Sequence, residues 1–98
     1  MSIRLRGRAG VAKKIYNNIE KFKFELTNSD QMDEGVNYKF AISYEDITGN
    51  IVIHEKGCNQ ILDVELTLDH WGLSLRLEDD ETLYALADKI LMDQGLEV

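Results

Sequence analysis

The sequence predicts one α+β domain: an N-terminal helix, a meander of four antiparallel strands and a C-terminal helix, with both helices on the apolar face of the sheet. Three observations lead to this prediction. Apolar residues recur at helical spacing near both ends of the chain, they alternate with polar residues in the middle, and turn-forming residues separate the alternating segments. Ninety-eight residues suffice for one hydrophobic core and are too few for two, so residues 1–98 are expected to form a single domain.

The N-terminal segment predicts a basic arm followed by an amphipathic helix. Residues 2–6 alternate between apolar and basic side chains, so residues 1–8 are expected to form a basic arm or a short edge strand. From about residue 9 to residue 24 the period becomes helical. One face of this helix carries Val11, Ile15, Ile19 and Phe22. The polar stretch that follows, residues 27–35, predicts a loop.

The first hairpin is expected to begin with a strand at residues 36–44, where aromatic and β-branched residues alternate with polar ones. Gly49-Asn50 is a favoured two-residue turn and would lead into a strand at residues 51–54. That turn would place Glu45 opposite His54. A three-residue turn would rotate His54 to the other face, so the register of this hairpin stays open.

The second hairpin has the clearest alternation in the chain. Residues 62–68 and 73–77 each carry an apolar side chain at every second position, and a turn at residues 69–72 joins them. If Leu68 opposes Leu73, then Arg76 lies opposite Glu65 as a cross-strand charge pair.

The C-terminal helix is expected to start after the acidic run Glu78-Asp79-Asp80 and to end near Gly95. Acidic residues at its start complement the helix dipole. Its apolar side chains recur at helical spacing and can cover the leucine face of the second hairpin.

The net charge of −7 is unevenly distributed: residues 1–23 carry +6 and residues 24–98 carry −13. Three interpretations follow. The basic segment binds nucleic acid, the acidic body binds a basic protein, or the two halves neutralise each other in the fold.

Several classes of protein are not expected. No apolar stretch approaches the length of a membrane-spanning helix, and the N-terminus lacks the apolar region of a secretory signal. The lone cysteine, Cys58, can form no internal disulfide, which favours the cytoplasm. Neither histidine pairs with Cys58 at zinc-finger spacing, so we expect no metal site and no cofactor.

An enzyme is also not expected. The sequence holds no nucleophile elbow, phosphate-binding loop or dinucleotide-binding turn. The alternative in this class is a small enzyme that works at a dimer interface through His54 and Cys58, with His70 as a further candidate, and a homodimer is therefore kept open.

The nucleic-acid alternative rests on the segment Arg4–Lys23, where basic residues are interleaved with aromatic ones. The strongly acidic remainder of the chain would repel a polyanion, which argues against this interpretation. The basic residues are Arg4, Arg6, Arg8, Lys13, Lys14, Lys21 and Lys23, and the aromatic ones are Tyr16, Phe22 and Phe24.

The leading hypothesis is a non-enzymatic protein-binding module with an acidic surface. Alternation sends the acidic residues of the second hairpin outward together, and Trp71 in its turn could anchor a partner. The expected partner-binding residues are Asp63, Glu65, Asp69, Trp71, Glu78, Asp79, Asp80 and Glu81. The expected partner is a basic protein, and the expected role is an inhibitor of the toxin-immunity, nuclease-inhibitor or anti-defence type, or a secretion chaperone.

Overall fold

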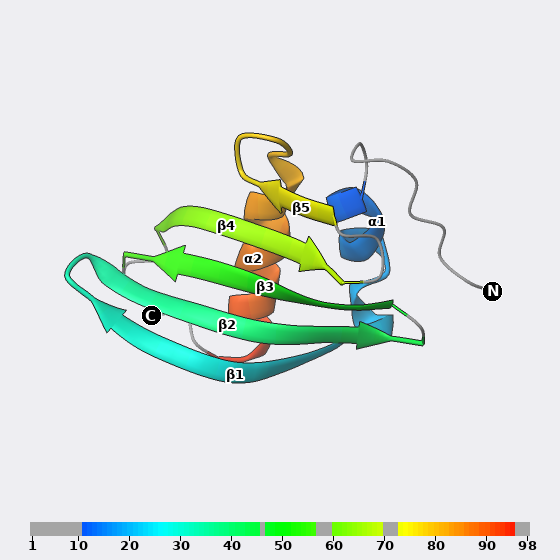
Figure 1. Cartoon of the computed structure of the whole chain (residues 1–98), viewed down its shortest axis with the longest axis horizontal. Coiled ribbons are helices and arrows are strands. Elements are labelled where there is room, and N and C mark those ends of the chain that lie inside the picture. The colour runs from blue at the N-terminus through cyan, green and yellow to red at the C-terminus, as the bar shows by residue number, and fades with distance from the viewer. Residues whose placement is uncertain (1–10, 46, 57–59, 70–72, 96–98) are drawn as a thin grey trace.

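The computed structural model describes residues 11–45, 47–56, 60–69 and 73–95, which form a five-stranded antiparallel sheet and two α-helices (Figure 1). Neighbouring strands follow chain order from β1 to β5, so the sheet is a meander. The predicted α+β class, the antiparallel meander and the two terminal helices are confirmed. The elements are α1 (Val11–Asn17), a short 3₁₀ turn η1 (Ile19–Lys21), β1 (Lys23–Met32), β2 (Gly35–Tyr44), β3 (Ile47–Glu55), β4 (Ile61–Leu68), β5 (Leu73–Arg76) and α2 (Thr82–Asp93).

The sheet has one strand more than predicted, because β1 occupies residues expected to end a helix and form a loop. Helix α1 stops at Asn17, and the side chain of Asn18 donates a hydrogen bond to the carbonyl of Lys14 (2.8 Å). Nearly every side chain of β1 is exposed. As an edge strand it is held by main-chain pairing with β2, so its sequence carries no apolar alternation.

The predicted turn at Gly49-Asn50 is wrong, because both residues lie inside β3. Tyr44 and Ile47 pair directly, and Glu45 between them adopts a positive φ of 54°. Gly49 allows a close approach of two backbones, because a Cβ at this position would clash with the carbonyl oxygen of Thr67.

The expected opposition of Glu45 and His54 is therefore wrong as well. His54 pairs with Asn37 on β2 and with Asp63 on β4. This register decides which side chains meet at the candidate site.

The predicted register of the second hairpin is confirmed, and residues 70–72 of its predicted turn lie outside the described residues. Leu68 opposes Leu73, and Glu65 opposes Arg76. The guanidinium of Arg76 reaches the carboxylate of Glu65 through Nη2 at 3.1 Å and Nε at 3.2 Å.

The core lies between the sheet and the two helices (Figure 1). Alternate residues of β2, β3 and β4 point to this side and are buried, among them Phe40, Ile51 and Leu66. Helix α2 crosses this face and contacts β4, and α1 packs against α2. None of the helices described is long and apolar enough to span a membrane.

The opposite face of the sheet has no described helix or strand over it, and we call it the open face (Figure 1). Its side chains are mostly small or polar. On β2 to β5 they belong to Asn37, Lys39, Ala41, Ser43, Thr48, Asn50, Val52, His54, Asp63, Glu65, Thr67, Ser74 and Arg76, and on β1 Lys23 and Asp30 share this face.

Candidate functional site

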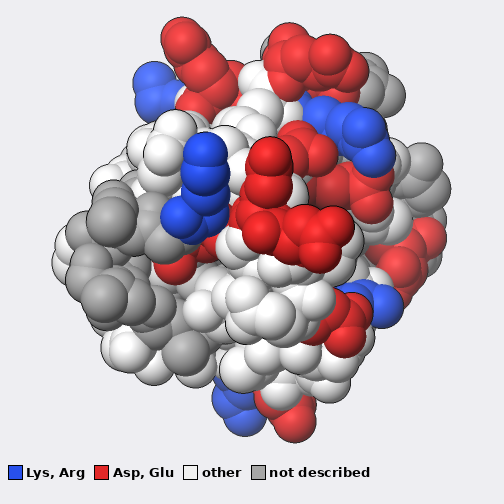
Figure 2. All heavy atoms as spheres, turned by 90° about the vertical axis from the view of Figure 1, so that its left-hand side faces the viewer, with Lys and Arg blue, Asp and Glu red and all other residues white. Residues whose placement is uncertain are grey.

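The meander brings three acidic segments to one end of the sheet. At this end lie the β1–β2 turn, the start of β4 and the connection from β5 to α2. We call the carboxylates of these segments the acidic end. They belong to Asp33, Glu34, Asp63, Glu65, Glu78, Asp79, Asp80 and Glu81. Figure 2 looks onto this end and shows acidic side chains spread across it, with fewer basic ones between them.

Arg76 lies among these carboxylates. The hydrogen bond and charge of Glu65, followed by the charges of Asp63 and Glu78, raise the pKa of Arg76 above its ordinary value. The main-chain N–H of Arg76 also donates to the carboxylate of Asp79 (3.0 Å). Negative charge at this end therefore exceeds what Arg76 neutralises.

Two of the predicted carboxylates also shape the local backbone. Asp79 accepts the N–H of Arg76 and holds the turn after β5, and Asp80 accepts the N–H of Thr82 (3.0 Å) at the start of α2. Asp80 makes this bond from the position before the N-cap residue, Glu81, whose own side chain makes no capping hydrogen bond. Glu78 and Glu81 are exposed.

A hollow of about 210 Å³ opens on the open face beside the acidic end. It is lined by Asn37, Val52, His54, Asp63, Glu65 and Arg76. Two of its side chains, Asp63 and Glu65, are carboxylates, and its one permanently cationic group, Arg76, is paired with Glu65. Such a lining suits a ligand that brings positive charge and several N–H donors, as a guanidinium or an ammonium does.

His54 is oriented by the β1–β2 turn. Its Nε2 lies 2.9 Å from the carbonyl oxygen of Glu34. A carbonyl oxygen can only accept, so Nε2 carries the proton, and Nδ1 of the neutral ring is an acceptor. Beside it, Oδ1 of Asn37 is buried without a hydrogen-bond partner. Sequence reasoning missed Asp33, Glu34 and Asn37 as parts of this site.

The structure separates Asp69 from the other predicted residues. Asp69 is exposed at the far end of β4, where its N–H donates to the carbonyl of Thr48 (3.0 Å). Six residues of extended chain place it about 20 Å from Asp63. Trp71 lies outside the described residues, and its role as an anchor stays a prediction.

Of the residues named for the small-enzyme alternative, only His54 is described. Cys58 and His70 lie outside the described residues. Within the part of the chain that the structure describes, no group of three or more histidine, cysteine or carboxylate side chains could hold a metal ion.

The described part of the basic segment, residues 11–23, lies at the opposite end of the sheet (Figure 1). Phe22, expected to be available for base stacking, is only 6% exposed and packs in the core against Phe24 and Tyr44, with ring centroids 6.3 Å and 5.2 Å away. Arg4, Arg6 and Arg8 lie outside the described residues.

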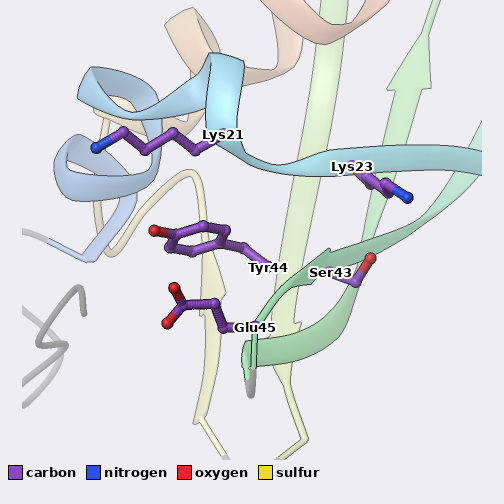
Figure 3. Close-up of a pocket in the computed structure, with 5 residues that line it drawn as sticks. All are labelled: Lys21, Lys23, Ser43, Tyr44 and Glu45. Atoms are coloured by element: carbon purple, nitrogen blue, oxygen red, sulfur yellow. The ribbon is translucent and has the colours of Figure 1, made fainter. Parts of the chain in front are cut away.

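A depression of about 260 Å³ at this basic end is lined by Lys21, Lys23, Ser43, Tyr44 and Glu45. In Figure 3 the side chains of Tyr44 and Glu45 extend side by side below Lys21, whereas Lys23 and Ser43 point the other way. Desolvation and then the Glu45 carboxylate raise the pKa of Tyr44. This carboxylate makes the depression a poor site for phosphate.

Glu55, at the end of β3, is 3% exposed and points to the helix side, where its Oε2 has no hydrogen-bond partner. Burial, and then the negative charge of Asp88 on α2, raise the pKa of Glu55 above its ordinary value of 4.5. The group adds to stability at low pH, and this contribution is lost as the pH rises through the folded-state pKa.

We expect Glu55→Gln to remove the loss of stability that Glu55 causes as the pH rises, because an amide does not ionise. The free energy of unfolding of the wild type should fall relative to that of the variant as the pH rises from 4.5. Urea unfolding of both proteins below pH 4.5 and at neutral pH measures the difference. Parallel pH dependences would contradict the burial of an ionisable Glu55.

A scan against protein-family models and searches of curated proteins and of solved structures found no match to this chain.

Proposed function

We propose that this protein is a non-enzymatic binding module whose acidic end recognises a basic protein. The observation that supports the proposal is the convergence of carboxylates from three separate segments on one end of the sheet. Like charges held together in this way cost stability in the free protein, and a complementary basic surface relieves that cost.

The hollow beside the acidic end offers a specific binding site for one side chain of the partner. Asp63 and Glu65 line it, and the aliphatic side chain of Val52 forms part of its wall. An arginine or lysine of the partner could lay its methylene groups against Val52 and direct its charged head to the carboxylates. Long-range attraction would then speed association, and the seated side chain would slow dissociation.

An inhibitor of the partner is the role we propose first, of the toxin-immunity, nuclease-inhibitor or anti-defence type, and a secretion chaperone is the second. This choice rests on analogy with small acidic proteins of those classes. It is compatible with a cytoplasmic protein.

The test is capture from a lysate of the native host with three versions of the protein. Asp63→Lys/Glu78→Lys reverses two carboxylates near Arg76, whereas Glu20→Lys/Asp69→Lys reverses two exposed carboxylates elsewhere. Both variants change the net charge from −7 to −3, since each reversal adds two. The proposal requires one basic protein that the wild type and the second variant retain and the first variant loses. Equal retention by both variants would contradict it.

The second candidate function, nucleic-acid binding, is favoured by the basic segment Arg4–Lys23. If these charges balance the acidic body instead, the intact protein should not bind duplex DNA or RNA at physiological salt. A gel shift at low micromolar protein checks this. A retarded band whose intensity falls steeply with added salt would revive the nucleic-acid interpretation.

A further inference from the structure

Strand β1 leaves a long main-chain edge uncovered. Among the described residues, the only strand that pairs with β1 is β2, and Figure 1 shows β1 along the lower margin of the sheet with no element beyond it. The N–H and C=O groups on the outer side of a ten-residue strand are a template for another strand. Near its start, the side-chain amide of Gln94, the residue after α2, donates a hydrogen bond to the carbonyl of Phe24 (3.4 Å).

Two large apolar side chains of β1 are exposed to solvent. Leu26 is 40% exposed and Met32 is 44% exposed, although each is a large hydrophobic residue. Natural sheets usually protect edges with proline, inward-pointing charges or short strands. β1 has no proline and is ten residues long, and its only irregularity is a bulge between Leu26 and Asn28.

The charges along this edge are polarised. Lys21 and Lys23 lie at its start, together with the carboxylate of Glu25, and Asp30, Asp33 and Glu34 follow towards and beyond its end. Antiparallel pairing of two such edges sets the basic start of one strand beside the acidic end of the other. Parallel pairing would set like charges together.

We propose that the outer edge of β1 binds the same edge of a second copy of this chain, antiparallel, so that two sheets join into one. A two-fold axis perpendicular to the sheet generates this pairing. With the axis between Leu26 and Thr27, Lys23 of each copy lies opposite Asp30 of the other, and both side chains are on the open face. If the pairing were shifted by two residues towards the end of β1, Glu25 of each copy would lie opposite Asp30 of the other. Two carboxylates would then face each other at each of these positions.

This dimer leaves the proposed partner surface accessible. The acidic end extends to the start of β4 and the β5–α2 connection, which lie away from β1, and the two-fold axis sends the two acidic ends to opposite ends of the joined sheet. The pairing does not depend on the proposed function.

Sedimentation velocity over a concentration series tests the proposal with the full chain. The wild type should pass from the monomer mass of 11.2 kDa to twice that mass, and added salt should weaken the dimer. Lys23→Glu and Asp30→Lys should each raise the dissociation constant about tenfold, because each places two like-charge pairs at the symmetric interface. The combined Lys23→Glu/Asp30→Lys should restore dimerisation.

Both positions are exposed, and circular dichroism checks that the variants fold. Asp69→Lys, an exposed charge reversal away from β1, is the control and should dimerise as the wild type does. A monomer at every concentration overturns the proposal. So does a dimer whose dissociation constant is unchanged in both single variants, because its interface would then lie elsewhere.

Discussion

Asp63→Lys/Glu78→Lys is expected to slow association with the basic partner by about ten- to a thousandfold at low ionic strength. Asp63 and Glu78 both act electrostatically on Arg76, so the double reversal replaces two negative charges beside this guanidinium with two positive ones. The loss should shrink as salt rises, because screening removes the attraction from the wild type. Stopped-flow or surface-based kinetics on the captured partner, over a salt series, measure this.

The matched variant, Glu20→Lys/Asp69→Lys, separates position from total charge. It carries the same net charge of −3, since its two reversals also add four to −7, but its substitutions lie outside the acidic end. Its association rate should stay much closer to that of the wild type. If both variants associate equally slowly, only net charge matters, and the acidic end is not the recognition surface.

Phe40→Ala is expected to cost about 3–5 kcal/mol of stability, the usual range for deleting a buried phenylalanine side chain. Phe40 is completely buried on β2, opposite Leu26 on β1 and Ile51 on β3, and its ring lies 6.5 Å from that of Tyr38. A domain of this size has roughly 5–15 kcal/mol in all. Urea unfolding should therefore show a much lower midpoint, or a protein already partly unfolded in buffer.

Lys39→Ala is the control for Phe40→Ala. Lys39 is the preceding residue of the same strand, but its side chain is exposed on the open face. Its truncation should change the midpoint little. Similar losses at both positions would contradict the assignment of the two faces of β2.

The second hairpin was predictable down to its register, because leucine or valine at every second position and a charge pair in one alignment agreed with each other. β1 was not, since an edge strand exposed on both faces has no periodicity to detect. The turn predicted at Gly49-Asn50 was wrong for a related reason. A glycine before an asparagine is typical of a turn, but here it allows two backbones to approach, which depends on a strand distant in sequence.

The candidate site was predictable only in part. Alternation placed Asp63 and Glu65 on one face, and the register of β4 and β5 then brings the residues after Arg76 to the same end. Asp69 shares that strand, but alternation fixes the face and says nothing about how far apart two side chains lie along it. The β1–β2 turn contributes Asp33 and Glu34 to the acidic end. Predicting this would have required knowing that β1 is a strand that pairs with β2, and its sequence carries no such pattern.

Hydrogen–deuterium exchange of the protein with and without its captured partner tests the central claim most directly. The acidic end predicts slower exchange at residues 33–35, 61–65 and 76–82 in the complex, with residues 11–21 and 44–48 unchanged. The described residues of these two sets lie at opposite ends of the molecule, so the measurement separates them (Figure 1). Slower exchange confined to residues 11–21 and 44–48 would place the partner at the basic end and contradict the account.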